Sequence, residues 1–181
     1  MKKQKLNRQT LFLLLLALSF TLFTGMKCKK ENNSVNNQLP PITQEGKNTF
    51  GFLLNGEVWL PKAPILKSKL DLSYDPTYNG GALGISAKRI LSENNQMYLS
   101  IGGININKPG TYNFEPPFKN VSYSDDVCYY TDGAKISGSI TITKLDLKGN
   151  GIISGTFNFK LEKEGCPTIN ATEGRFDLSI Q

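Results

Sequence analysis

The chain has 181 residues, of which 39% are hydrophobic and 20% charged, with 17 glycines, 9 prolines, 3 cysteines and no histidine. This length suits one domain, or one domain that follows a processed leader. Without histidine, Ser-His-Asp and Cys-His nucleophile pairs are excluded, and the usual neutral-pH general base and commonest metal ligand are missing. The residue types alone therefore point to no catalytic chemistry.

The N-terminus has the pattern of an export signal. Residues 1–10 carry four basic side chains and no acid, and residues 11–23 are apolar or hydroxylic throughout. A membrane-spanning helix needs about 20 apolar residues, so this shorter run predicts a secretory signal peptide rather than a transmembrane helix. Cys28 follows the run closely, and the segment resembles a bacterial lipoprotein leader, in which such a cysteine is lipidated and becomes the first residue.

The predicted leader covers residues 1–27 and departs from the lipoprotein pattern at Lys27, where Gly, Ala or Ser is expected. A soluble secreted chain cut somewhere in residues 20–28 is the alternative. The lipoprotein resemblance implies a cell-envelope protein that is lipid-anchored to the outer membrane and faces the periplasm or the cell surface. The membrane, reached through lipidated Cys28, is then its first expected partner.

The net charge of +6 comes mostly from the leader. Five of the 21 basic residues lie there, which leaves 16 basic residues against 15 acidic ones (Lys2, Lys3, Lys5, Arg8 and Lys27 are the five). Nucleic-acid binders usually carry a clustered basic face. We therefore expect no nucleic-acid partner.

Residues 28–47 are rich in Asn, Gln, Lys, Glu and Pro and have no apolar periodicity. Such a segment cannot bury enough apolar surface to offset its loss of conformational entropy. It is interpreted as a flexible polar tether, with a short edge strand around Ile42 and Thr43 as the alternative.

From residue 48 to residue 181 apolar and polar residues alternate in short runs. Asn55-Gly56 between two such runs predicts a hairpin turn, because both turn positions favour positive φ, and Trp59 at its end is expected in the core. No segment shows a sustained helical pattern, and at most a helical turn is expected near Ala87–Asn94. About nine or ten short strands indicate one all-β domain, an antiparallel β-sandwich or flattened barrel.

The C-terminal strands are the clearest. Ile140 and Ile142 occupy even-numbered positions and share one face of the strand, whereas Leu145 is odd-numbered. The change predicts a β-bulge near Lys144. Gly155, inside the next strand, is expected to allow close approach of a neighbouring chain. In the last strand Arg175 and Asp177 alternate with apolar residues and are expected to form a charge pair on the solvated face.

Three stretches together resemble a family of small Bacteroidota lipoproteins of unknown function. They are TFGFLLNGEVWLPK with its NG-x-x-W pattern, the paired strands ending in GTFNF, and the closing ATEGRFDLSI. The resemblance implies an envelope location and an all-β fold. It implies no activity and no site.

Removing Cys28 leaves two cysteines, Cys128 and Cys166. Export would place them where disulfides persist, and an even pair near two strand ends predicts a disulfide between them. Two thiols without an imidazole do not form a zinc site. We predict no metal and no cofactor.

The segment 112–132 is dense in aromatic and acidic residues. Aromatic faces stack on sugar rings while carboxylates accept hydroxyl hydrogens, so a glycan-binding surface is one hypothesis; the other is a loop that packs its own aromatics against the domain. A Ca²⁺ site at Asp125, Asp126 and Asp132 matches no ordered calcium loop. The candidate ligand residues are Tyr112, Phe118, Tyr123, Asp125, Asp126, Tyr129 and Tyr130.

These observations favour an envelope-tethered lipoprotein with a non-catalytic binding or structural domain, whose partner is a glycan or another envelope protein. The alternative is a secreted polysaccharide hydrolase with a carboxylate pair. Glycosidases need two carboxylates about 5–10 Å apart. Nothing in the spacing of Glu57, Glu115, Asp125 and Asp126 selects such a pair.

Overall fold

The computed structural model describes residues 38–180, so the predicted signal peptide, Cys28 and the first part of the expected tether lie outside the described residues. The described chain forms ten strands in two sheets, with every strand pairing antiparallel. Neither sheet closes on itself. The all-β sandwich expected from the alternation is therefore confirmed, and the flattened barrel is not what forms.

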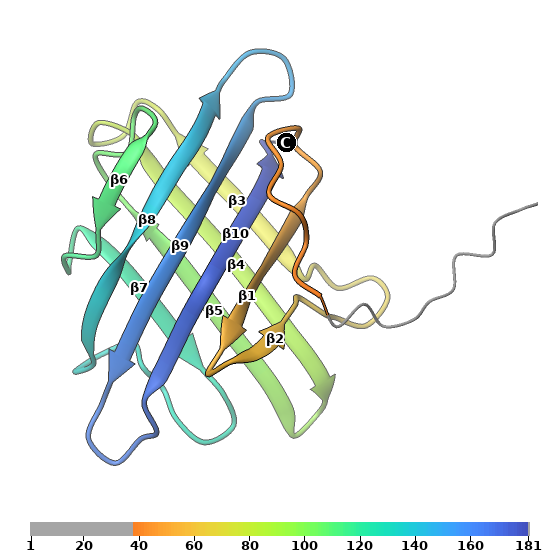
Figure 1. Ribbon diagram of the computed structural model, residues 1–181, viewed down its shortest axis with the longest axis vertical. Helices are drawn as coiled ribbons and strands as arrows, with labels where there is room; N and C mark the ends of the chain where they lie inside the picture. The colour runs from red at the N-terminus through yellow and green to blue at the C-terminus, as the bar shows by residue number, and fades with distance from the viewer. Residues whose placement is uncertain (1–37, 181) are drawn as a thin grey trace, which may run out of the picture. The chain divides into compact units, whose positions relative to one another are not determined.

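The first sheet has the order β2-β1-β10-β9-β8-β6 and the second has the order β3-β4-β5-β7. In Figure 1 the first sheet faces the viewer and the second, drawn fainter, lies behind it with its strands crossing those in front. The strands are β1 (Thr49–Leu54), β2 (Glu57–Trp59), β3 (Leu70–Asp75), β4 (Ala82–Ser92), β5 (Asn95–Gly103), β6 (Gly110–Asn113), β7 (Lys119–Ser124), β8 (Lys135–Asp146), β9 (Ile152–Glu162) and β10 (Ile169–Ser179).

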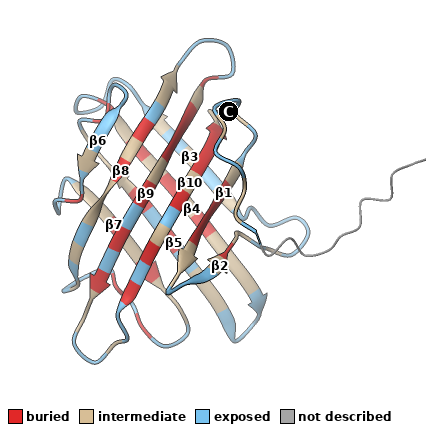
Figure 2. Cartoon of the chain, in the orientation of Figure 1, coloured by how far each residue is buried: buried red, intermediate tan, exposed pale blue. Residues whose placement is uncertain are grey.

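One hydrophobic core fills the space between the sheets. The first sheet contributes a cluster of aromatic rings in contact with one another, and the second contributes mainly aliphatic side chains from alternate positions. Figure 2 shows the resulting alternation of buried and less buried residues along β8, β9 and β10. The aromatic cluster is Phe50, Phe52, Trp59, Phe157 and Phe159, and the facing residues include Leu83, Ile85, Leu99, Ile101 and Val121.

Three local predictions are confirmed. Asn55 and Gly56 both have positive φ (49° and 91°) in the turn between β1 and β2. The register of β8 against β9 shifts between Ile142 and Lys144, which returns Leu145 to the core side. At Gly155 an added Cβ would lie 2.1 Å from the carbonyl oxygen of Thr141, so a larger residue would separate β9 from β8.

The helical turn expected near Ala87–Asn94 is wrong. Strand β4 continues to Ser92 and turns directly into β5, with Ile90 opposite Gln96. The irregular local pattern of this stretch carries little conformational preference, and its pairing with β5 determines its structure. Within residues 38–180 there is no helix long and apolar enough to cross a membrane.

The end of the expected tether lies against the sandwich. Residues 38–47 run across the outer side of the first sheet, where Figure 1 shows them in orange in front of β1 and β10. Lys144 Nζ donates a hydrogen bond to the carbonyl oxygen of Gln44 (3.0 Å), and Leu39 and Pro40 pack close to Gly51. We call residues 38–47 the strap. The strap is ordered against the first sheet, whereas a flexible tether was expected over residues 28–47.

Asp177 fastens the strap. Its carboxylate accepts hydrogen bonds from the Thr43 hydroxyl (2.6 Å), the Gly46 backbone N–H (2.7 Å) and, across the sheet, the Ser154 hydroxyl (2.7 Å). The expected charge pair between Arg175 and Asp177 is therefore wrong, because the strap buries Asp177. Arg175 instead forms an ion pair with Glu173 (3.0 Å).

Candidate functional site

The segment that the sequence singled out, residues 112–132, divides into buried and exposed parts. The Tyr123 and Tyr130 rings are buried in the core and contact each other. Tyr112 is partly buried on edge strand β6, and its hydroxyl donates to the Lys108 carbonyl oxygen (2.7 Å). Phe118 and Tyr129 are 60% and 67% exposed, so they are the two aromatic residues of the candidate set that a ligand can reach from solvent.

Burial raises the pKa of both Tyr123 and Tyr130, and the carboxylate of Asp125 adds to the effect. These two phenols are therefore neutral at physiological pH and act as core side chains. Tyr130 donates its hydroxyl hydrogen to the carbonyl oxygen of Pro167, which satisfies the polar end of a ring that is otherwise surrounded by apolar groups.

Asp125 and Asp126 hold the backbone after β7. Asp125 Oδ1 accepts the backbone N–H groups of Val127 (2.9 Å) and Cys128 (2.8 Å), and Asp126 Oδ2 accepts the backbone N–H of Gln96 (3.0 Å). These bonds engage one oxygen of each carboxylate in holding the backbone. The acidic pair is thus placed as a turn-forming element.

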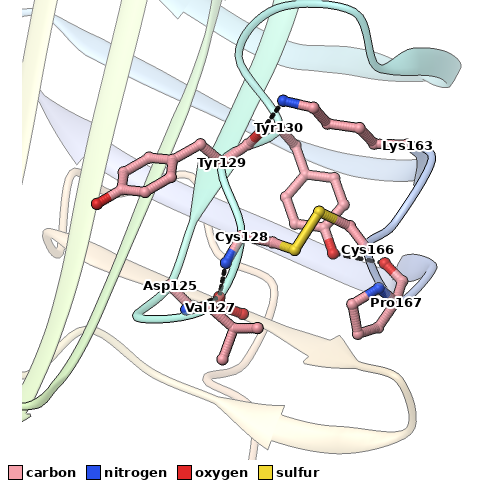
Figure 3. Close-up of a disulfide and its surroundings, with 8 residues drawn as sticks. All are labelled: Asp125, Val127, Cys128, Tyr129, Tyr130, Lys163, Cys166 and Pro167. Atoms are coloured by element: carbon pink, nitrogen blue, oxygen red, sulfur yellow. Dashed lines mark hydrogen bonds between the residues drawn. A yellow bond between two sulfur atoms is a disulfide. The ribbon is translucent and has the colours of Figure 1, made fainter.

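The predicted disulfide between Cys128 and Cys166 is confirmed, with 6.0 Å between the Cα atoms. It joins the turn after β7 to the connection between β9 and β10, and Lys163 Nζ adds a hydrogen bond to the Tyr129 carbonyl oxygen (2.6 Å). Figure 3 shows the Tyr130 ring beside the disulfide and the Tyr129 ring pointing away from it. The cross-link therefore fixes the backbone that carries exposed Tyr129.

Tyr129 joins a row of side chains on the outer face of the second sheet. Tyr98 on β5 lies opposite Ser124 on β7, and Ser124 lies opposite Tyr129. Residues directly opposite in antiparallel strands project from the same face, so the two tyrosines flank Ser124 about 10 Å apart, which is two interstrand spacings. Tyr98 is 40% exposed.

The same face continues along β4, β5 and β7 with small and polar residues. Next to the tyrosine row Ser100 is paired with Ser122, and beyond them Gly102 is paired with Asn120. A Cβ at Gly102 would lie 2.5 Å from the Leu83 carbonyl oxygen, so the face stays flat there. We call this surface the serine face; it consists of Ser86, Tyr98, Ser100, Gly102, Phe118, Asn120, Ser122, Ser124 and Tyr129.

A hollow of about 340 Å³ lies at the end of the serine face away from the tyrosines. Phe118, Asn120, Ser100 and Ser122 line it. Among the described residues, the Oδ1 atom of Asn120 is buried and accepts no hydrogen bond. A buried carbonyl-type oxygen without a donor is unfavourable by about 1–3 kcal/mol, but this atom is too enclosed for a ligand in the hollow to contact it.

Sequence reasoning identified Phe118 and Tyr129 but missed Tyr98 and Asn120. A signal was present for Tyr98: in QMYLSIGG the inward residues are Leu99 and Ile101, so Tyr98 and Ser100 must face outward. No local signal marks Asn120, because its unsatisfied oxygen depends on how β7 packs beside β5.

The carboxylates considered for hydrolysis are not placed as a pair. Glu57 lies on β2 and Glu115 follows β6, and these strands form opposite edges of the first sheet. Asp125 and Asp126 bind backbone N–H groups. In the described range the carboxyl pKa values that clearly depart from normal are all lowered: by the Thr77 hydroxyl at Asp75, by Lys160 at Glu162, and by the hydrogen bonds from Thr43 and Ser154 at Asp177. A general acid requires a raised pKa.

These features define a small, disulfide-linked, all-β sandwich domain with one polar, aromatic-flanked outer face. The chain belongs to the family described as a domain of unknown function (DUF6252), whose model matches residues 73–177. The match includes both bonded cysteines and the whole serine face. No curated protein and no solved structure matches the chain.

Proposed function

We propose that the chain is an envelope lipoprotein of the Bacteroidota type, anchored through Cys28, whose sandwich domain binds a glycan chain on the serine face without catalysis. Two features support the binding proposal: exposed rings at both ends of the face, and hydroxyl and amide groups between them. The observation that carries it is the placement of the exposed rings, with Phe118 at one end and Tyr98 and Tyr129 at the other, because aromatic rings stack on the apolar sides of sugars.

The dimensions of the serine face suit a short oligosaccharide. From Asn120 to Ser124 the strand rises about 13 Å, and the tyrosine row is about 10 Å wide. Aromatic rings stack on the apolar sides of sugar rings, while serine hydroxyls exchange hydrogen bonds with sugar hydroxyls. An extended glycan lying along β7 would meet a ring at each end and polar groups between.

The binding proposal predicts losses confined to this face. Phe118→Ala and Tyr98→Ala are each expected to weaken binding of an envelope-derived oligosaccharide about tenfold, because each removes one stacking ring. Isothermal titration calorimetry after a glycan-array screen measures the change. Tyr112→Ala is the matched control, because it removes an aromatic ring from the edge of the other sheet and should leave affinity unchanged.

Two outcomes contradict the binding proposal. Equal weakening by Tyr112→Ala and Phe118→Ala would place the ligand elsewhere, and release of shorter oligosaccharides during incubation would favour the hydrolase alternative. Thermal unfolding of each variant shows that the domain remains folded.

The anchor predicts a specific mature N-terminus. Mass spectrometry of the protein from its native membrane should find Cys28 as the first residue, carrying a diacylglyceryl group, and Cys28→Ser should move the protein from the membrane fraction to the soluble fraction. An unmodified N-terminus elsewhere in residues 20–28 would show that the protein is secreted in soluble form rather than lipid-anchored. The glycan proposal does not depend on this result.

A further inference from the structure

The connection between β2 and β3, residues 60–69, projects from the sandwich on two fixed stems. The Lys62 backbone N–H donates to the Lys88 carbonyl oxygen (2.9 Å), and the Ile90 N–H donates to the Lys62 carbonyl oxygen (2.7 Å). At the other stem the Lys88 N–H donates to the Lys69 carbonyl oxygen (2.9 Å). Both stems are therefore bonded to β4, and residues 63–68 form a tip between them.

The tip presents two large apolar side chains to solvent. Ile65 is 93% exposed and Leu66 is 100% exposed. They occupy a turn closed by a hydrogen bond from the Lys67 N–H to the Pro64 carbonyl oxygen (3.1 Å), in which Leu66 has a φ of 73°. Glycine or asparagine is the usual residue at such a position, so Leu66 is unfavourable both for the turn and for its hydration.

The tip does not pack against the domain. A hollow of about 590 Å³ separates residues 63–72 from the end of β10, with Leu178 and Ser179 on its far side. The stems are fixed by hydrogen bonds, and the apolar side chains of the tip are exposed to solvent. Ile65 and Leu66 are therefore positioned to contact an apolar environment outside the domain.

The charges around the tip are positive. Lys62, Lys67 and Lys69 are exposed, and residues 60–69 contain no acidic side chain. The nearby carboxylate of Asp71 accepts the Ser68 hydroxyl hydrogen (2.6 Å) and lies 3.7 Å from Lys88 Nζ. Apolar residues surrounded by lysines complement an anionic bilayer surface, where acyl chains lie directly beneath phosphate groups.

The strap begins close to the start of this loop. The side chains of Leu39, at the start of the strap, and Leu60, at the start of the loop, both pack within 3.3 Å of the position that a Cβ on Gly51 would occupy. Gln38 lies ten positions after Cys28 in the sequence, and ten steps of extended chain span at most about 35 Å. An anchored Cys28 would therefore keep this loop within reach of the membrane.

We propose that the tip of the β2–β3 loop inserts into the anionic bilayer, with Ile65 and Leu66 among the acyl chains and Lys62, Lys67 and Lys69 at the headgroup phosphates. The orientation of the domain in this proposal rests on the proposed anchor at Cys28. The affinity of the loop for lipid does not, because the loop's own side chains supply it.

The test measures binding of the predicted mature chain, residues 28–181 with Cys28→Ser, to vesicles of phosphatidylethanolamine and phosphatidylglycerol. The chain should sediment with these vesicles and bind vesicles of phosphatidylcholine much less. Ile65→Ser with Leu66→Gly should lower the partition coefficient at least about tenfold, because two buried aliphatic side chains are lost. Val127→Ser, at an exposed apolar residue in another turn, is the matched control and should have no effect.

Glycine at position 66 suits the positive φ, so the double variant should fold normally, and its thermal unfolding midpoint verifies this. Replacing Lys62, Lys67 and Lys69 with Gln should weaken binding about fivefold per lysine at low salt. Lys148→Gln, at an exposed turn lysine, should not.

Absence of wild-type binding to the anionic vesicles would overturn the proposal, as would a double variant that binds as well as wild type. Equal binding to phosphatidylcholine would contradict the role of the lysines. Failure of the anchor is seen separately, as an unmodified Cys28 in mass spectrometry. Each result therefore identifies which of the two proposals has failed.

Discussion

Replacing Cys128 and Cys166 together with Ala is expected to lower the free energy of unfolding by about 4 kcal/mol. The disulfide closes a loop with a sequence separation of 38 residues, and in the chain-entropy model its removal gives the unfolded chain that much additional freedom. Urea denaturation measures the change. The denaturant slope should rise as well, because the reduced unfolded chain is more expanded.

Cys28→Ser is the control for this change, because it removes a thiol outside the cross-linked pair and should leave stability unchanged. A loss below about 1 kcal/mol in the double variant would contradict the expected role of the disulfide. The Tyr130 hydroxyl offers an independent comparison. Tyr130→Phe removes the hydrogen bond to Pro167 and should lower the free energy of unfolding by about 1 kcal/mol.

Asp177→Asn is expected to lower the free energy of unfolding by about 3 kcal/mol. The carboxylate accepts hydrogen bonds from two hydroxyl groups and from backbone N–H groups of the strap, and hydrogen bonds to a buried charge are stronger than neutral ones. An amide accepts through one oxygen only. Its NH₂ group would face the remaining donors.

The same carboxylate makes stability depend on pH in acid. Burial alone would raise the pKa of Asp177, but the hydrogen bonds from Thr43 and Ser154 outweigh it and hold the pKa well below its usual range. A group whose pKa is lower in the folded state stabilises the fold above its unfolded pKa, which is about 3.9 for Asp. Stability should therefore be full above about pH 5 and fall as the pH drops through 4.

The acid-dependent part of the stability should be reduced in Asp177→Asn, as followed by urea midpoints between neutral pH and pH 3. Asp132→Asn is the matched control, because Asp132 is exposed and its replacement should leave the acid profile unchanged. If Asp177→Asn and wild type lose stability in parallel below pH 4, Asp177 is not the group responsible.

The strands were predictable because their physical cause is local. A strand with one buried face needs an apolar residue at every second position, and this pattern marks β8, β9 and β10 without knowledge of their partners. The bulge near Lys144 was predictable for the same reason. The apolar positions change from even at Ile142 to odd at Leu145, and one extra residue between them lets both face the same core.

The strap was not predictable, because its cause is not local. Residues 38–47 have no apolar periodicity, and they are ordered by a carboxylate 134 residues away from Thr43. Asp177 sits in a clean alternation that places it outside the core, and the alternation is right. The alternation does not reveal that the strap covers Asp177 from outside the sheet.

The candidate site was predicted in part. Aromatic density pointed to residues 112–132, but density does not distinguish rings that face inward from rings that face outward. Parity does so where a strand is regular, and it separates inward-facing Tyr123, which is buried, from outward-facing Ser124, which is half-buried. After β7 the chain turns at Asp125, and the disulfide, which pairs distant residues, sets the direction of Tyr129.

The position of β10 has a consequence for how the protein forms. This last strand lies inside the first sheet, between β1 and β9, so the sheet cannot be completed until the C-terminal residues are available. Contacts between the two ends of a chain form slowly, and a nascent polypeptide that lacks its final strand has two unpaired sheet edges. Completion of the first sheet therefore depends on the pairing of β10 with both β1 and β9.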